Sequence, residues 1–213
     1  MEIRRTANAG VLLRIDGKAI LLDGVCGEVA PYLKTPFALY QQLLAERIDA
    51  VVFTHTHPDH YDGLFVSDYL QKSAGPVMGP AEISVGMQGM LRLDGVQITP
   101  VESRHIGKTD CTQHRSYIIT GSRCVWFIGD ASPLHWQSYE NLPHPDVLIA
   151  PYGFLIGRGW DYCKKINPGI IILLHMPERE NDPYGLWEAV KQIPCTENDP
   201  KILIPDMGQS LNV

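Results

Sequence analysis

A dense cluster of metal-binding residue types constrains this sequence more than any other feature. Four such side chains, His55, His57, Asp59 and His60, fall within six residues. They follow the apolar segment Asp49–Phe53, which the sequence predicts to be a short buried strand. Neutral imidazoles and carboxylates are ligand types that zinc and similar cations prefer. A solvated loop that happens to be rich in histidine is the alternative, but crowded polar groups beside a core are costly without a cation.

The local geometry of this segment predicts two ion positions. In an extended backbone, side chains two residues apart project to the same side, so His55 and His57 can bind one ion. Pro58 stiffens the bend that follows. Beyond that bend, Asp59 and His60 could be aimed at a second ion beside the first.

Four local ligands rarely complete a two-metal site, so we expect distant ligands as well. Three candidates, His105, Asp130 and His175, each follow a predicted strand, and loops at strand ends collect functional groups. Each alone could equally be a turn residue or a capped core residue, because single motifs are only hypotheses. Together they make a converging site the stronger interpretation. The predicted strands before them are residues 96–101, 125–129 and 170–174.

The hydrophobic patterns predict two mixed β-sheets with helices outside, an α/β arrangement. Residues 10–15 and 18–23 alternate around Asp16-Gly17, a signature of a β-hairpin. Early strands are followed by alternating strands and helices, without an internal repeat or linker. Further strands are predicted at residues 117–120, 124–128, 146–150 and 201–204, the last closing the chain, and helices at residues 37–47, 64–72, 158–166 and 183–193.

Length and charge limit the class of protein. The chain has 213 residues, which fits a single domain over 1–213. A formal net charge of −6 argues against a nucleic-acid partner, which would need broad phosphate neutralisation. The first apolar stretch is broken by charged residues, and no segment approaches the ~20 apolar residues of a membrane span. We therefore expect a cytoplasmic protein with a small-molecule substrate; its oligomeric state is open.

The cysteines indicate neither disulfides nor a thiolate metal site. Their number is odd, and no two form a C-x-x-C pair. We expect free thiols in a reducing compartment. The five are Cys26, Cys111, Cys124, Cys163 and Cys195.

The order of the motifs resembles that of the metallo-β-lactamase superfamily. The segment from His55 to His60, a later histidine, Gly129-Asp130 and a strand-end His175 are similar to its successive ligand motifs. The likeness covers nearly the whole chain and implies a four-layer αββα sandwich of two mixed sheets flanked by helices, with the metals at one edge. Residues 6–13, 20–23 and 150–153 resemble segments of the ascorbate-phosphate lactonase-like and ribonuclease Z-like branch.

The resemblance also implies a ligand set. His55, His57 and His105 would hold one ion, Asp59, His60 and His175 the other, and Asp130 would bridge them. The third motif is open between His105 and His114. His105 is favoured because it ends a strand and loop, whereas His114 is expected at the opening of the next strand, residues 115–120.

The function implied is metal-dependent hydrolysis of an ester, lactone or phosphodiester-type substrate, with Asp59 orienting the attacking water. Two divalent transition-metal ions are expected; zinc is favoured, and manganese or iron suit the same ligands. The alternatives are a catalytically silent metal-binding or regulatory protein and a di-iron redox protein. Tyr152, Arg158 and Trp160, which precede His175, are candidate substrate contacts. His135 and His144 are expected at the surface.

Overall fold

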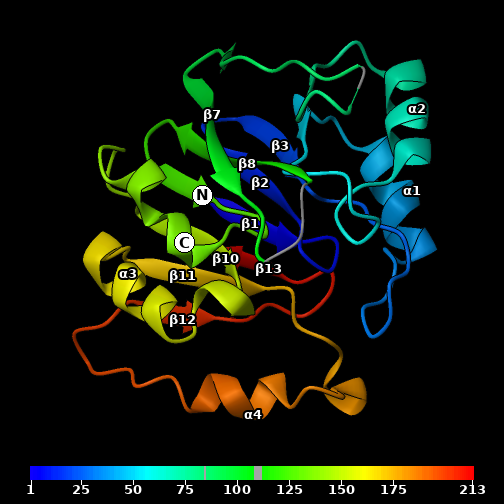
Figure 1. The fold of residues 1–213 in the computed structure, drawn as a ribbon. Coiled ribbons are helices and arrows are strands. Elements are labelled where there is room, and N and C mark those ends of the chain that lie inside the picture. Colours follow the sequence, from blue (N-terminus) through cyan, green and yellow to red (C-terminus); the bar gives the residue numbers. More distant parts are fainter. Residues whose placement is uncertain (84, 108–111) are drawn as a thin grey trace.

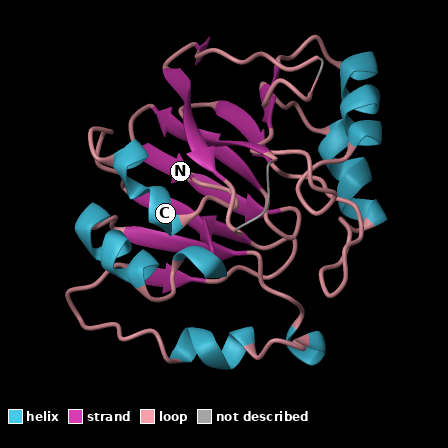
Figure 2. Cartoon of the chain, in the orientation of Figure 1, coloured by secondary structure: helices cyan, strands magenta, loops and turns pink. Residues whose placement is uncertain are grey.

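Two β-sheets form the centre of the molecule, and helices lie outside them (Figure 2). The computed structural model describes residues 1–83, 85–107 and 112–213, apart from the side chains of residues 136–138. The sheets contain six and seven strands. The prediction of two mixed sheets is confirmed.

The first sheet is built around the predicted hairpin. Strands β2 (Val11–Ile15) and β3 (Lys18–Leu22) are antiparallel. Asp16 and Gly17 between them have φ values of 48° and 75°, and positive φ at both positions is what a tight hairpin turn requires. The sheet order is β13–β1–β2–β3–β4–β5. Its other strands are β1 (Glu2–Arg5), β4 (Ala50–Val52), β5 (Val77–Met78) and β13 (Ser210–Asn212).

The second sheet joins an antiparallel half to a parallel half, in the order β12–β11–β10–β9–β8–β7–β6. Strands β6 to β9 pair antiparallel with their neighbours, whereas β9 to β12 run parallel. The carboxyl ends of parallel strands meet at one edge of a sheet, where ligand sites collect. The seven strands are β6 (Leu91–Leu93), β7 (Val96–Arg104), β8 (Gln113–Thr120), β9 (Cys124–Phe127), β10 (Val147–Pro151), β11 (Ile170–Leu174) and β12 (Lys201–Leu203).

The alternating side chains of the strands fill three hydrophobic layers. Leu13 of β2 and Ile149 of β10 belong to the layer between the two sheets. Leu12, the neighbour of Leu13, points to the opposite face of its sheet and packs against helices. This is the period of two that a β-strand imposes, with both faces of the sheet covered.

The helices cover the outer faces of both sheets. Helices α1 (Phe37–Ala45) and α2 (Gly63–Lys72) pack on the first sheet. Helix α3 (Arg158–Ile166) packs on the second sheet, and Figure 1 shows it across the strands from α1 and α2. The order helix, sheet, sheet, helix confirms the predicted αββα sandwich. The remaining helical segments are η1 (Pro133–Tyr139), η2 (Tyr152–Phe154), η3 (Arg179–Asn181) and α4 (Leu186–Lys191).

Three predictions about the elements need correction. Residues 201–204 do not provide the final strand, because Ser210–Asn212 forms β13 and pairs antiparallel with β1. The helix predicted over residues 183–193 is shorter: α4 begins after Gly185, whose φ is 65°. Strand β8 begins at Gln113, so His114 lies within the strand and does not precede it.

The described cysteines are free thiols, as expected; Cys111 lies outside the described residues. Across residues 1–83, 85–107 and 112–213, every helix is too short or too polar to traverse a bilayer.

We expect the hydrophobic layer between the sheets to contribute most to the free energy of unfolding. Leu13 is fully buried there, so Leu13→Ala should lower the free energy of unfolding by about 2–5 kcal/mol in a urea titration. Leu64→Ala removes the same atoms from a side chain that is 76% exposed and should change it by less than about 0.5 kcal/mol. Equal effects of the two substitutions would contradict the inter-sheet placement of Leu13.

Candidate metal centre

Two groups of three ligand-type side chains converge at one edge of the sandwich. His55, His57 and His105 each offer a ring nitrogen, and the three atoms lie within 4.8 Å of one another. Asp59, His60 and His175 form a second group by the same criterion. The ring centroids of His55 and His60, one from each group, are 4.1 Å apart. The two groups are therefore adjacent.

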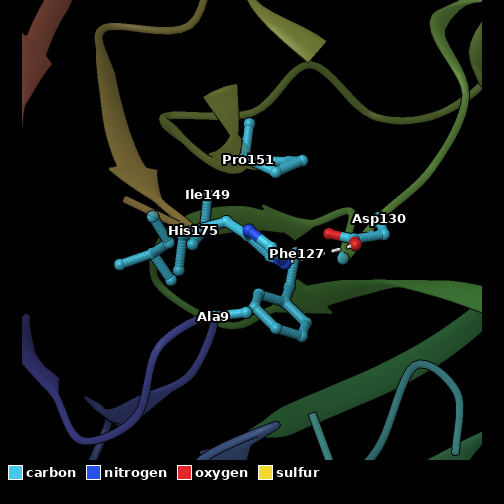
Figure 3. A pocket seen from close by; sticks show the side chains of 9 residues that line it. Ala9, Phe127, Asp130, Ile149, Pro151 and His175 are labelled. Atoms are coloured by element: carbon cyan, nitrogen blue, oxygen red, sulfur yellow. Dashed lines mark ion pairs between the residues drawn. The ribbon is translucent and has the colours of Figure 1, made fainter. Parts of the chain in front are cut away.

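Asp130 lies between the two groups. Its Oδ2 atom is 3.4 Å from Nε2 of His60, 3.4 Å from Nε2 of His175 and 3.7 Å from Nε2 of His105. Figure 3 shows the His175 ring directed toward the Asp130 carboxylate. One carboxylate thus faces histidines from both groups, the position that a bridging ligand would occupy.

Several of the polar atoms facing this space are buried and lack hydrogen-bond partners among the described residues. Within the described part of the chain, Nε2 of His55 and Oδ1 of Asp130 have no such partner. Buried polar groups are normally satisfied, so partnerless atoms that face one another need an explanation. A divalent cation supplies one, since neutral imidazole and carboxylate are its preferred ligands. The donor set therefore fits metal ions.

Hydrogen bonds fix the orientation of two of the histidine rings. The Nδ1 atom of His105 lies 2.6 Å from the Ile106 carbonyl oxygen, which can only accept, so Nδ1 carries the proton. Nδ1 of His55 lies 2.9 Å from the Thr54 hydroxyl. These contacts leave the Nε2 atoms facing the ligand groups, as such partners of metal-binding histidines commonly do.

Asp23 fixes the orientation of the His60 ring, a role that the sequence did not predict. Its Oδ2 accepts a hydrogen bond of 2.9 Å from Nδ1 of His60, and both its oxygens accept from Thr54. Asp23 is fully buried at the end of β3, beside β4, which leads into the ligand segment. An aspartate directly after the apolar strand 18–22 was the signal that could have identified it.

Gly129 permits the close approach that brings Asp130 into the site. Its φ is 50°, a conformation that favours glycine. A Cβ atom at this position would lie 2.6 Å from the side chain of Thr54. The glycine therefore allows the end of β9 to meet the end of β4.

His175 has a strained backbone that its neighbours stabilise. Its φ is 59°, which is uncommon outside glycine. Its amide donates to the Asn8 carbonyl oxygen at 3.1 Å, and its ring packs edge-on against Tyr32 with centroids 4.4 Å apart. Such strain concentrates at functional sites, where surrounding contacts maintain it.

Burial and neighbouring charges shift the pKa values of the cluster in opposite directions. Burial lowers the pKa of His55, which keeps that imidazole neutral. Burial also opposes charge on His60, but the carboxylates of Asp130 and Asp23 outweigh it and raise the pKa of His60 well above its usual value. Burial opposes ionisation of Asp130 too, yet the charges of His175 and His60 hold its pKa well below its usual value. Asp130 is therefore an anion facing imidazoles.

His114 lies behind the first group. Its Nδ1 is 2.7 Å from the Ser103 hydroxyl, and its ring centroid is 5.2 Å from that of His55. Burial lowers the pKa of His114 to about 3, so the ring is neutral. Among the described residues, one three-membered ligand group includes His105, and none includes His114. The choice of His105 as third-motif ligand stays a prediction that this geometry favours.

The other residues singled out from the sequence lie around the site or away from it. A cavity of about 170 Å³ opens beside Asp130 and His175, and Tyr32 and Tyr152 line it. Trp160 is 3% exposed and lines a different cavity, so it is not placed to contact a substrate at the ligand groups. Arg158 and the half-buried His135 line a third cavity, and His144 is exposed.

Comparison with solved structures identifies the fold. A novel metallo hydrolase from the archaeon Ignicoccus hospitalis is similar over 99% of this chain and 97% of its own, with a TM-score of 0.72 and 20% identity. The chain has the metallo-β-lactamase fold. A protein described by that fold, YhfI from Bacillus subtilis, matches 99% of each chain with a TM-score of 0.66 and 18% identity.

Two further structures share the metallo-β-lactamase fold with this chain. An isothiocyanate hydrolase from Delia radicum gut bacteria covers 100% of this chain and 99% of its own, with a TM-score of 0.67 and 20% identity. CmlA, a diiron β-hydroxylase from Streptomyces venezuelae, matches all of this chain but 54% of its own, with a TM-score of 0.64 and 16% identity.

The sequence alone also matches the metallo-β-lactamase superfamily profile, over residues 4–66. That range includes Asp23 and the segment from His55 to His60. No curated protein matches the sequence. The resemblance to the superfamily is confirmed, whereas the lactonase-like and ribonuclease Z-like branch stays a prediction.

Asp23 should control metal affinity through His60. The asparagine in Asp23→Asn has a single acceptor oxygen. It cannot replace both carboxylate oxygens, of which one accepts from His60 Nδ1 and the other from Thr54 N. We expect metal affinity, measured by competition with a chromogenic chelator, to fall about 10–100-fold. Asp94→Asn, at a side chain that is 99% exposed, should leave affinity unchanged. Unchanged affinity in Asp23→Asn would show that His60 does not depend on this carboxylate.

Proposed function

We propose that this protein is a metal-dependent hydrolase acting on a small ester, lactone or phosphodiester-type substrate. The observation that carries the proposal is the convergence of seven ligand-type side chains from four segments far apart in the sequence. Asp130 lies within 3.7 Å of three of the histidines. A chain without a metal-dependent role would not need to bury so many polar groups facing one another.

In this proposal the protein holds two divalent ions. His55, His57 and His105 hold one, and Asp59, His60 and His175 hold the other. Asp130 bridges the pair. Zinc is the favoured metal because its usual ligands are imidazole nitrogens and carboxylate oxygens; manganese and iron suit the same donors.

Ions held in this way activate water for attack on an electrophilic centre. Asp59 orients the water: its Oδ2 is 3.1 Å from Nε2 of His175, and its carboxylate lies at the edge of the second group. A carboxylate here accepts a hydrogen bond from the attacking water and can receive its proton. Burial raises the pKa of Tyr32 to about 12, so its phenol keeps its proton beside the site.

The size of the cavity favours a small substrate. It has a volume of about 170 Å³, with Asp130 and His175 among its polar lining and Ile106 and Leu186 among its apolar lining. Small-molecule sites are typically concave and apolar, with a few convergent polar groups. The similarity to proteins named as hydrolases supports the same reaction class.

A second candidate is a di-iron redox protein on the same ligands. It is favoured by the structural similarity to CmlA, described as a diiron β-hydroxylase. Iron bound in the purified protein, with an absorption band that changes on reduction, would support it. A colourless zinc protein with hydrolytic turnover would exclude it.

The purified protein should contain about two transition-metal ions per chain when metal is supplied. His57→Ala removes a ligand of the first group and Asp130→Ala removes the bridge, so both should lose metal and hydrolytic activity together. The measurement is elemental analysis beside turnover on chromogenic ester, lactone and phosphodiester substrates.

His144→Ala, at an exposed histidine, is the matched control and should retain both properties. A wild-type protein that binds no ion under metal-replete conditions would refute the proposal. Bound metal with no turnover on the whole panel would favour the catalytically silent alternative.

The ring and the hydroxyl of Tyr32 should have separate effects, the ring on metal binding and the hydroxyl on kcat. Tyr32→Ala removes the ring that packs on His175, so we expect weaker metal binding as well as lower kcat/KM. Tyr32→Phe keeps the ring and should retain the metal while losing any contribution of the hydroxyl to kcat. Metal analysis and steady-state kinetics separate the two. Identical metal loss in both variants would contradict this division.

A further inference from the structure

A second cavity lies next to the site and is lined by basic side chains. Its volume is about 520 Å³, and it shares Ile106 and Gly153 with the smaller cavity beside Asp130 and His175. A Cβ atom at Gly153 would lie 2.8 Å from Cδ1 of Ile106, so these two residues form the boundary between the cavities. Arg104 and Arg158 line the larger cavity.

The backbone pairing beyond β7 and β9 connects the two cavities. His105 and Ala131 form an antiparallel bridge. Ile106 N donates to the Asp130 carbonyl oxygen at 2.8 Å, and Ser132 N donates to the Arg104 carbonyl oxygen at 2.7 Å. Ile106 therefore lies across from Asp130, and Arg104 across from Ser132.

Arg104, Ile106 and Ser132 line the larger cavity, and Ile106 also lines the smaller cavity together with Asp130. Two residues of extended chain advance by about 7 Å, so the arginine end lies about that far along from the Asp130 end. The same paired segments thus serve both the metal site and the second cavity.

The described residues provide no carboxylate that offsets the arginines of the larger cavity. Among the described residues, neither Arg104 nor Arg158 forms an ion pair with a carboxylate, and no lining residue is acidic. Arg104 Nη1 lies 3.4 Å from Nε2 of His135, and both residues line the cavity. Two exposed arginines without a carboxylate partner among the described residues thus line one cavity, in a chain with a formal net charge of −6.

We propose that this cavity binds an oxyanion group, a carboxylate or a phosphate, at the far end of the substrate whose reacting centre lies at the metal site. Guanidinium groups match such anions in planar shape and donor spacing. The Ser132 hydroxyl accepts a hydrogen bond from Leu134 N and retains its own proton to donate. This inference rests on the proposed hydrolase function and narrows its substrates to anionic molecules.

The first test titrates the zinc-loaded full chain with inorganic phosphate and with acetate. The amide signals of Gly107, Gly153 and Gly159, which line the cavity, are followed by NMR. Arg104→Gln and Arg158→Gln should each weaken anion binding about tenfold, because each removes a charge-assisted hydrogen bond. Tighter binding of phosphate indicates a phosphorylated substrate, and tighter binding of acetate a carboxylate.

Arg92→Gln is the matched control. Arg92 is an exposed arginine of β6 in the same sheet, and the described part of the chain shows no ion pair for it, so the charge change is identical. It should leave anion binding unchanged. His57→Ala tests whether anion binding depends on the metal site. Anion binding in the cavity should persist in this variant. Binding lost in His57→Ala but kept in both arginine variants would overturn the proposal.

The second test compares adipate with hexanoate, which has the same length but one carboxylate. Adipate can place one carboxylate at the ions and the other between the arginines. We expect it to bind the zinc-loaded protein about tenfold more tightly than hexanoate, with the difference lost in Arg104→Gln and Arg158→Gln. Equal affinities would overturn the inference but leave the hydrolase proposal standing, since that depends on metal content and turnover.

Discussion

The contact between Asp130 and the surrounding histidines is the interaction on which the rest of the site depends. A nearly buried carboxylate loses its hydration and must be compensated. His60, His105 and His175 provide this compensation from three different segments. The strands before these residues end at the same edge of the sandwich. The fold must therefore bring these strand ends together for the Asp130 carboxylate to be compensated.

A second set of contacts keeps that arrangement in place. Asp23 accepts hydrogen bonds from His60 and Thr54, so the end of β3 fixes the segment that follows β4. Gly129 lets β9 approach Thr54 from the other sheet. Tyr32 supports His175, whose backbone conformation is strained. Each of these residues acts on a ligand-type side chain through packing or hydrogen bonding, and so helps the ligand atoms to face one another.

Beyond the ligand groups, the paired segments 104–106 and 130–132 extend away from Asp130. They lead from Asp130 to Arg104, and so from an acidic centre to a basic cavity. This gradient would orient an anionic molecule, with its reacting bond at the ions and its charge at the arginines. The arrangement supplies a physical basis for substrate selection that the ligand set, shared by many chemistries, cannot provide by itself.

The sequence by itself determined the two mixed sheets and the candidate ligands, because alternation in residues 10–23 and the apolar runs before His55 and His175 are local signals. Only the tertiary structure decided the partners of those residues. Asp23 read as the end of a strand, and β13 was missed because three residues pairing with β1 leave no pattern of their own. Arg104 has no sequence feature that distinguishes it from the other arginines. These roles depend on contacts between segments that are distant in the chain. A local sequence pattern does not show which distant segments come into contact.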